Sequence, residues 1–425
     1  MDRFVIHGPN RLAGTVRASG AKNAALPALA ACLLTDRPVR LERVPAVRDI
    51  RTMCRLLGHL GMACETGFDG AVTLFRDGPG ALAHEAPYEL VKTMRASVLV
   101  LGPLLARHGE ARVSLPGGCA IGVRPIDQHL EGLQALGAEV ELEHGYVTVR
   151  ARRLAGGRFR FAVPTVTGTE NVLMAATLAR GTTVLENCAT EPEVGDLAAL
   201  LSAMGARIEG AGGPVIEVEG VADLGGADHR VIPDRIEAGT YLVAAAMAGG
   251  AVRVEGARPA DLAPLTEKLA AAGVALDEEP EALTVRGNGE LAPVDVDTAP
   301  HPGFPTDLQA QFMALMTRAR GVSTIRELVF ENRFQHAPEL ARMGADVRID
   351  GNTARVHGPA ALAGAHVMAT DLRASASLVI AGLAATGETV VHRIYHLDRG
   401  YEAMESKLQT LGARVERVTG APPPD

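Results

Sequence analysis

The feature that most constrains this chain is a short phrase that occurs six times: the end of a helical run, a glycine, and then alternating apolar and polar residues. The six glycines are separated by 76, 68, 68, 71 and 68 residues. A glycine after a helical run is typical of a helix C-terminus, and the alternation after it is typical of a half-buried strand. We therefore expect six related units. Their glycines are Gly61, Gly137, Gly205, Gly273, Gly344 and Gly412.

Each unit also contains a segment that is apolar on nearly every side, as in a helix buried within a domain. A strand-like strip and an amphipathic second helix follow it, so each unit is predicted to run βαβαββ. The period is longer than that of the common solenoids, and 425 residues suffice for two globular domains. We expect an α/β fold with three units in each domain. The buried helices are predicted within residues 23–34, 95–106, 170–179, 237–248, 307–316 and 373–384.

The chain is expected to cross between the two domains twice. The break between the third and fourth units is placed near residues 230–234. The first 21 residues carry strand patterns but no opening helix, so they are expected to complete the second domain. The first domain then spans 22–231, and the second combines 1–21 with 232–425. The Pro-rich tail, 419–425, is expected to be disordered.

Composition argues against several classes of protein. The net charge of −8 argues against nucleic-acid binding, and neither a signal peptide nor a transmembrane run is present. An odd number of cysteines without a CxxC pair predicts reduced thiols in a cytoplasmic protein. Cys32, Cys54, Cys64 and Cys188 adjoin apolar stretches and are expected to be small buried hydrophobes, whereas Cys119 lies in a Gly/Pro-rich loop.

The sequence holds no motif for a nucleotide cofactor or a metal. It contains no P-loop, no dinucleotide fingerprint and no His/Cys/Asp cluster with zinc spacing. We therefore expect no cofactor and no metal site. The histidines, including His129, His301 and His336, are expected at the surface or at helix caps.

Cationic side chains collect where the buried helices begin, among them Lys22, Arg95, Arg235 and Arg373. Helix capping and solvated loop charge would explain any one of them. They do not explain the set, because the dipole at a helix N-terminus favours anions. An anion held between each arginine and its helix would explain it. We expect substrates with phosphate or carboxylate groups, in a cleft that the helix starts of both domains face. Further arginines precede the repeat glycines, namely Arg48, Arg124, Arg333 and Arg399.

Nine longer motifs lie in colinear order: SGAKNAALP, YELVKTMRAS, LPGGCAIGVRPIDQHL, PTVTGTENVLMAA, PDRIEAGT, FPTDLQAQF, ENRF, ATDLRASASL and DRGYE. With these motifs the chain resembles the UDP-N-acetylglucosamine 1-carboxyvinyltransferase family of enolpyruvyl transferases from Met1 to about Val418. The resemblance implies a two-domain inside-out α/β barrel. It also implies transfer of the enolpyruvyl group of phosphoenolpyruvate to the 3-hydroxyl of UDP-N-acetylglucosamine, with release of phosphate, at the start of peptidoglycan synthesis.

The resemblance also implies roles for individual residues. Cys119, on a lid loop, would protonate C3 of phosphoenolpyruvate and would be alkylated by the antibiotic fosfomycin. Asp307 would be the base at the sugar hydroxyl, or a helix N-cap, and Asp371 would assist; which of the two is the dominant base stays open. Lys22, Arg124 and Arg399 complete the catalytic set. The implied contacts to phosphoenolpyruvate are Lys22, Asn23, Arg124, Arg373 and Arg399. Those to UDP-N-acetylglucosamine are Arg95, Arg124, Pro125, Ile126, Asp127, Gln128, Val163, Pro164, Thr165, Val166, Asp307 and Val329.

Two alternatives stay open. The sister family that transfers the same group to shikimate 3-phosphate shares the repeat but lacks the cysteine loop, so Cys119 favours the UDP-sugar. A non-catalytic UDP-sugar sensor would have no need of the acid–base set. In either case the expected partners are small molecules, without nucleic acid or membrane.

Overall fold

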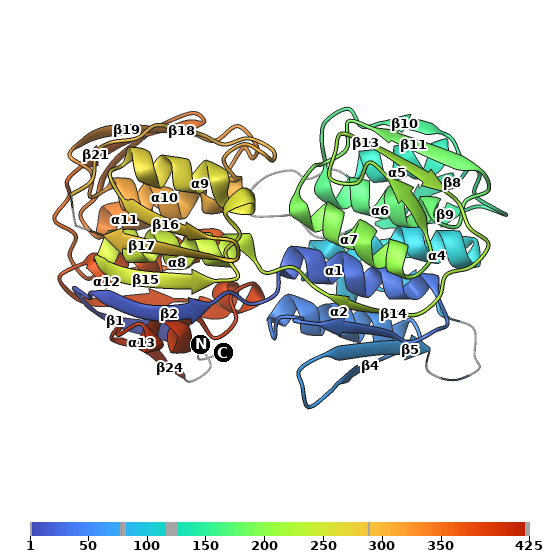
Figure 1. The fold of residues 1–425 in the computed structure, drawn as a ribbon, viewed down its shortest axis with the longest axis horizontal. Helices are drawn as coiled ribbons and strands as arrows, with labels where there is room; N and C mark the ends of the chain where they lie inside the picture. The colour runs from blue at the N-terminus through green and yellow to red at the C-terminus, as the bar shows by residue number, and fades with distance from the viewer. Residues whose placement is uncertain (1, 77, 79–81, 116–125, 288–289, 421–425) are drawn as a thin grey trace. The chain divides into compact units, whose positions relative to one another are not determined.

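The computed structural model describes residues 2–76, 78, 82–115, 126–287 and 290–420 (Figure 1). These residues form two compact units. The first unit holds the described residues of 20–232, and the second holds 2–19 together with those of 233–420. The chain therefore crosses between the units after residues 19 and 232, where the sequence predicted crossings after 21 and 231. Residues 421–425 of the predicted disordered tail lie outside the described residues.

Three four-stranded sheets build the first unit. In each sheet the first two strands, in the order given below, are parallel and every other pair is antiparallel. The sheets are β14 (Ala227–Arg230), β3 (Val39–Glu42), β5 (Val72–Arg76) and β4 (Met62–Thr66); β6 (Glu85–Ala86), β7 (Glu110–Ser114), β9 (Tyr146–Arg150) and β8 (Glu139–Glu143); and β10 (Arg158–Arg160), β11 (Thr182–Glu186), β13 (Val215–Glu219) and β12 (Arg207–Glu209).

The second unit repeats this topology three more times, with strands from both ends of the chain. Strand β1 lies between β23 and β24, and β2 pairs in parallel with β15. The N-terminal segment thus completes two sheets. The sheets are β2 (Leu12–Arg17), β15 (Gly250–Glu255), β17 (Ala282–Gly287) and β16 (Ala275–Glu279); β18 (Val296–Asp297), β19 (Gly321–Arg326), β21 (Thr353–Gly358) and β20 (Asp346–Asp350); and β22 (His366–Met368), β23 (Gly387–His392), β1 (Arg3–Gly8) and β24 (Val415–Val418).

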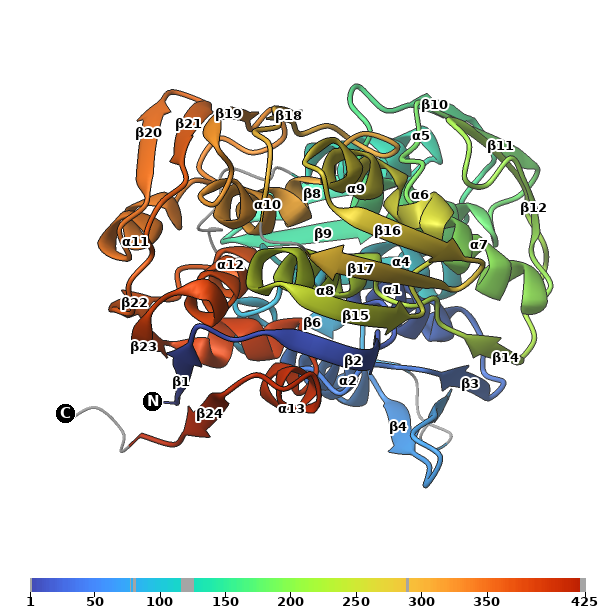
Figure 2. The same ribbon diagram turned by 60° about the vertical axis from the view of Figure 1, so that its left-hand side comes forward.

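Each unit encloses three inner helices that are almost wholly buried. Figure 2 shows the sheet of β16, β17, β15 and β2 lying over α8, which it contacts. The predicted α/β class and the predicted buried helices are confirmed. No helix in the described ranges is long and apolar enough to cross a membrane. The inner helices are α1 (Lys22–Ala31), α4 (Leu101–His108) after the 3₁₀ turn η2 (Arg95–Val100), α6 (Val166–Ala176), α8 (Arg235–Ala248), α10 (Gln309–Met316) after η3 (Thr306–Leu308), and α12 (Leu372–Ala384).

A second helix in each repeat ends two residues before the repeat glycine. All six glycines have left-handed φ values, between +88° and +105°. Past the end of α7, the amide of Ala206 donates to the carbonyl of Leu201 at 2.9 Å, and Gly205 donates to Ser202 at 3.0 Å. This pair of bonds is the Schellman arrangement, so the predicted glycine-capped helix ends are confirmed. The second helices are α2 (Arg48–His59), α5 (Asp127–Ala135), α7 (Pro192–Ala203), α9 (Pro259–Ala271), α11 (Ala337–Arg342) and α13 (Met404–Thr410).

Replacing a repeat glycine should destabilise its unit through backbone strain alone. Gly205 has a φ of +105°, and a Cβ there would meet no atom within 4 Å. Gly205→Ala should therefore lower the free energy of unfolding by about 1–2 kcal/mol, the cost of a left-handed conformation for an L-residue. Gly195→Ala, in the interior of α7 and equally free of neighbours, should instead stabilise by up to about 1 kcal/mol. Urea unfolding measures both, and equal effects would contradict the role of φ.

Candidate functional site

In the second unit, the carboxylate of Asp307 is held by two buried arginines. Arg333 donates from Nη2 to Asp307 Oδ1 at 2.5 Å, and Arg373 donates from Nε to Oδ2 at 3.2 Å. The arginine side chains are 5% and 4% exposed, and that of Asp307 is 26% exposed. Arg373 also keeps Nη1 buried with no hydrogen-bond partner among the described residues. Both arginines thus bind the same carboxylate.

Helix starts position these charges. Asp307 lies in the turn η3 that precedes α10, and Arg373 lies in the first turn of α12. The N-caps of η3 and α10 are Pro305 and Leu308, and neither receives a side-chain cap bond. The interpretation of Asp307 as a helix N-cap is therefore wrong, because its oxygens face the arginines instead.

Asp371 has the capping role that Asp307 lacks. It is the N-cap of α12, and its Oδ1 accepts hydrogen bonds from the amides of Arg373 at 2.8 Å and Ala374 at 3.0 Å. A side chain that closes the helix start in this way fixes the backbone from which Arg373 extends. Asp371 therefore positions Arg373.

A buried hydrogen-bond chain supports the second arginine. Arg333 Nη1 donates to Thr306 Oγ1 at 2.9 Å, and Thr306 in turn donates to Glu327 Oε2 at 2.8 Å. Glu327 is 3% exposed, and its Oε1 accepts from Thr298 Oγ1 and from the amide of Val329, both at 2.9 Å. This chain ties Val329, a predicted binding residue, to Arg333. No sequence pattern predicted a role for Glu327, because the residues that it contacts come from separate segments of the chain.

In the first unit, Lys22 is paired with a carboxylate that sequence reasoning missed. Its Nζ lies 3.2 Å from Oδ2 of Asp49, and the two side chains are 11% and 6% exposed. Lys22 begins α1 and Asp49 lies in the first turn of α2, so two helix starts meet at this pair. Asn23 and Arg48 are exposed beside them. A buried pair of this kind is costly to desolvate, and it holds the ammonium group in one place.

The starts of α5 and α6 bring together most of the predicted UDP-sugar residues of this unit. Gln128 Oε1 accepts a hydrogen bond from the amide of Val163 at 3.2 Å, and the two helices are in contact. Thr165 caps α6 by accepting from Gly168 N at 3.4 Å. Ile126 is buried, whereas Asp127, Val163 and Pro164 are exposed, and Val166 opens α6.

The remaining predicted residues are less informative. Arg95 opens η2 and Arg399 closes η4 (Ile394–Arg399), and both side chains are half-buried. Cys119, Arg124 and Pro125 lie outside the described residues. No group of three or more side chains suited to a metal ion occurs in the described part of the chain.

The expectation that the histidines lie at the surface or at helix caps is wrong for His129, which is 2% exposed and lies within α5. His336 is the N-cap residue of α11, as the expectation allowed, but it is fully buried. His129 accepts from Asn171 Nδ2 through Nδ1 at 3.0 Å, so its Nε2 carries the proton and faces Thr167 Oγ1 at 3.3 Å. Burial, reinforced by the charge of Arg95, lowers the pKa of His129 to about 3. Burial likewise lowers the pKa of His336 to about 4. Both residues are neutral in the folded protein.

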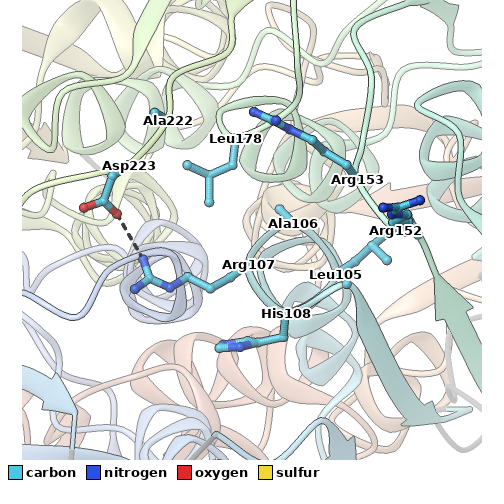
Figure 3. A pocket seen from close by; sticks show the side chains of 11 residues that line it. Leu105, Ala106, Arg107, His108, Arg152, Arg153, Leu178, Ala222 and Asp223 are labelled. Atoms are coloured by element: carbon cyan, nitrogen blue, oxygen red, sulfur yellow. Dashed lines mark hydrogen bonds and ion pairs between the residues drawn. The ribbon is translucent and has the colours of Figure 1, made fainter.

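A pocket of 510 Å³ opens elsewhere on the first unit, at the end of α4 (Figure 3). Arg107 and Asp223 form an ion pair of 3.4 Å in its wall, and Arg152 and Arg153 also line it. None of the predicted site residues is among its lining residues in the described part of the chain. The pocket is therefore separate from the clusters above.

The buried neutral His129 should make the stability of the first unit depend on pH. Its folded pKa of about 3 lies below the unfolded value near 6.5, so the unfolded state binds the extra proton. The contribution of neutral His129 to the free energy of unfolding is fully present above about pH 6.5 and is lost as the pH falls toward 3. His129→Gln cannot titrate and should reduce the loss of stability between pH 7 and 5 by about 2 kcal/mol.

Urea unfolding at the two pH values checks this dependence. His59→Gln, which changes an exposed histidine of α2, is the matched control and should keep the wild-type difference. An unchanged pH dependence in His129→Gln would show that other groups cause the acid sensitivity.

Comparisons with known proteins match these units over nearly the whole chain. The model of the EPSP synthase (3-phosphoshikimate 1-carboxyvinyltransferase) family matches residues 6–408. A UDP-N-acetylglucosamine 1-carboxyvinyltransferase from Sorangium cellulosum (strain So ce56) is 60% identical over 423 residues, 99% of each chain. The enolpyruvyl transferase NikO from Streptomyces tendae has a similar structure, with a TM-score of 0.88 and 29% identity over 99% of each chain. An EPSP synthase from Acinetobacter baumannii shares the fold, with a TM-score of 0.76 and 18% identity over 99% of this chain and 100% of that one.

Proposed function

The chain belongs to the EPSP synthase family of enolpyruvyl transferases, and on that basis we propose that it transfers the enolpyruvyl group of phosphoenolpyruvate to the 3-hydroxyl of UDP-N-acetylglucosamine. The choice of UDP-N-acetylglucosamine as the acceptor substrate rests on one observation. The chain is 60% identical, over 99% of its length, to a relative named for that sugar nucleotide. The EPSP synthase structure is only 18% identical and supports the fold alone. The proposed reaction is the first committed step of peptidoglycan synthesis, which places the enzyme in the cytoplasm.

The reaction is an addition followed by an elimination. A proton is added to C3 of phosphoenolpyruvate, C2 becomes cation-like, and the sugar hydroxyl attacks it. The tetrahedral intermediate then loses a proton from C3 together with phosphate. The site must therefore supply an acid at C3, a base at the hydroxyl, and cations around the phosphate and carboxylate groups. Cys119 is proposed as the acid and as the thiol that fosfomycin alkylates, on the resemblance of its loop.

Asp307 is the proposed base. Two buried arginines favour its ionised form, which is the form that can accept a proton. Its side chain is still 26% exposed, so a hydroxyl group can reach it. Asp371, in contrast, has an oxygen engaged by two backbone amides of α12. This difference favours Asp307 over Asp371 as the dominant base and gives Asp371 the role of positioning Arg373.

The cations that the chemistry needs are proposed to bind phosphoenolpyruvate. Arg373 supports this role most directly, because its buried Nη1 finds no acceptor among the described residues. A phosphate or carboxylate oxygen would satisfy that donor, and a charge-assisted bond of this kind is strong. Lys22 is held in place by Asp49. The proposed contacts are Lys22, Asn23, Arg124, Arg373 and Arg399.

The UDP-sugar is proposed to bind where Gln128 and Val163 meet and where α6 begins. The exposed segment before α6 offers backbone groups to a nucleotide, and Thr165 fixes its end by capping the helix. The proposed contacts are Arg95, Arg124, Pro125, Ile126, Asp127, Gln128, Val163, Pro164, Thr165, Val166, Asp307 and Val329.

One assay tests the proposed function. Phosphate release from phosphoenolpyruvate should depend on UDP-N-acetylglucosamine, and shikimate 3-phosphate should not replace it. The reverse preference would assign the chain to the shikimate branch. Binding of the UDP-sugar without any phosphate release would instead indicate a sensor.

Two isosteric variants should separate the roles of the aspartates. Asp307→Asn keeps the shape of the side chain but cannot take up the hydroxyl proton, so kcat should fall roughly 10² to 10⁴-fold while UDP-N-acetylglucosamine still binds. Asp371→Asn should stay within a few-fold of wild type, because asparagine caps a helix as well as aspartate does. Steady-state kinetics and ligand titration measure both variants. A larger loss of kcat in Asp371→Asn than in Asp307→Asn would make Asp371 the base and Asp307 the positioning residue.

A further inference from the structure

Three thiols gather in the first unit, apart from the proposed catalytic residues. Cys32 lies in the 3₁₀ turn η1 (Cys32–Leu34), Cys54 in α2 and Cys64 in β4. The Sγ of Cys64 donates to the backbone carbonyl oxygen of Cys54 at 3.9 Å, so the two cysteines are direct neighbours. Helix α2 and strand β4 pack against each other at this point. All three cysteines are reduced.

The three thiols differ in their access to solvent. Cys54 and Cys64 are partly exposed, whereas Cys32 is fully buried and donates to the carbonyl oxygen of Ala28 at 3.3 Å. The expectation of a small buried hydrophobe is confirmed for Cys32 and Cys188, whereas Cys54 and Cys64 pack against the hydrophobic core but are only partly buried. A small dissolved oxidant can therefore reach the pair but not Cys32.

The two partly exposed thiols also differ in acidity. The neighbouring Cys64 side chain lowers the pKa of Cys54, although burial acts in the opposite direction. The neighbouring Cys54 side chain and burial both raise the pKa of Cys64. Cys54 is thus the more nucleophilic sulfur, and Cys64 carries the proton. A low-pKa thiol with a second thiol beside it is the arrangement found in redox-sensitive cysteines.

We propose that Cys54 and Cys64 form a redox-modification site that closes to a disulfide between α2 and β4 when the protein meets hydrogen peroxide. The Cys54 thiolate attacks one peroxide oxygen, so that an S–O bond forms, the O–O bond breaks and hydroxide leaves. The Cys64 sulfur then attacks Cys54, the S–S bond forms, and the sulfenic oxygen leaves as water with the Cys64 proton. The two thiols lose two electrons, and one peroxide takes them up.

The disulfide would cross-link α2 to β4 on either side of the turn at Gly61. Cross-linking two residues so close in sequence restricts the unfolded chain and stabilises the folded unit. Helix α2 also carries Asp49, the partner of Lys22. The disulfide would therefore restrain the helix that positions the ammonium group of Lys22. The inference does not depend on the acceptor or on the reaction proposed above.

Peptide mapping of the full-length protein tests the proposal. Trypsin cleaves after Arg55, between the two cysteines, so a disulfide would join peptides 52–55 and 56–76. After peroxide treatment and alkylation with N-ethylmaleimide, the linked pair should appear, and dithiothreitol should remove it. Cys119 falls in a different peptide, 113–150, and its modification is counted separately. The first unfolding transition should rise by roughly 5–10 °C on oxidation.

Two variants complete the test. Cys32→Ser should keep both the linked peptides and the thermal shift, whereas Cys64→Ser should lose both. The peptide map of the peroxide-treated wild-type protein shows whether the Cys54–Cys64 disulfide forms, even if a variant folds poorly. Free Cys54 and Cys64 thiols after peroxide treatment, or a link from Cys54 to Cys32, would overturn the proposal.

Discussion

A helix without a polar face has to be enclosed on every side, and this requirement organises both units. The side chains of α8 and α12 are buried from their first turn to their last. A single sheet can cover only one side of such a helix, so each unit places three inner helices against one another and closes three sheets around them. The polar groups that chemistry needs have no room along these helices. They remain at the helix starts, and the candidate residues Lys22, Asp307 and Arg373 lie there.

Charges at the edge of such a core need partners, and one buried donor here lacks an acceptor among the described residues. One carboxylate, Asp307, serves both Arg333 and Arg373, and Arg373 keeps a buried donor free among the described residues. A buried donor without an acceptor costs about 1–3 kcal/mol, and more when it is charged. An anionic ligand would remove this cost on binding. The unsatisfied Nη1 of Arg373 is therefore a physical reason for affinity toward phosphate or carboxylate in a protein whose net charge is −8.

The sequence predicted the parts of the structure that depend on local pattern. The repeat glycines, the buried helices and the strand alternation follow from spacing and from backbone conformation, which neighbouring residues determine. Pairs that come from distant segments left no such signal: Lys22 with Asp49, and Arg333 with Asp307. His129 was misplaced for the same reason, because its partners Thr167 and Asn171 lie on another helix. A sequence pattern shows which face of a helix is buried, but it does not show which polar side chain from another segment contacts that face.

The six repeats share one topology, so what distinguishes them chemically has to lie in how their inner helices begin. Three of these helices receive a side-chain cap, from Thr165, Asp234 and Asp371. The starts of α1, η2 and η3 receive no side-chain cap bond within the described residues. These three starts carry Lys22, Arg95 and Asp307. Amides that no side chain caps keep their donors for water or for an anionic ligand. The repeat thus supplies one fold six times, and its copies differ in whether a side chain caps the start of the inner helix.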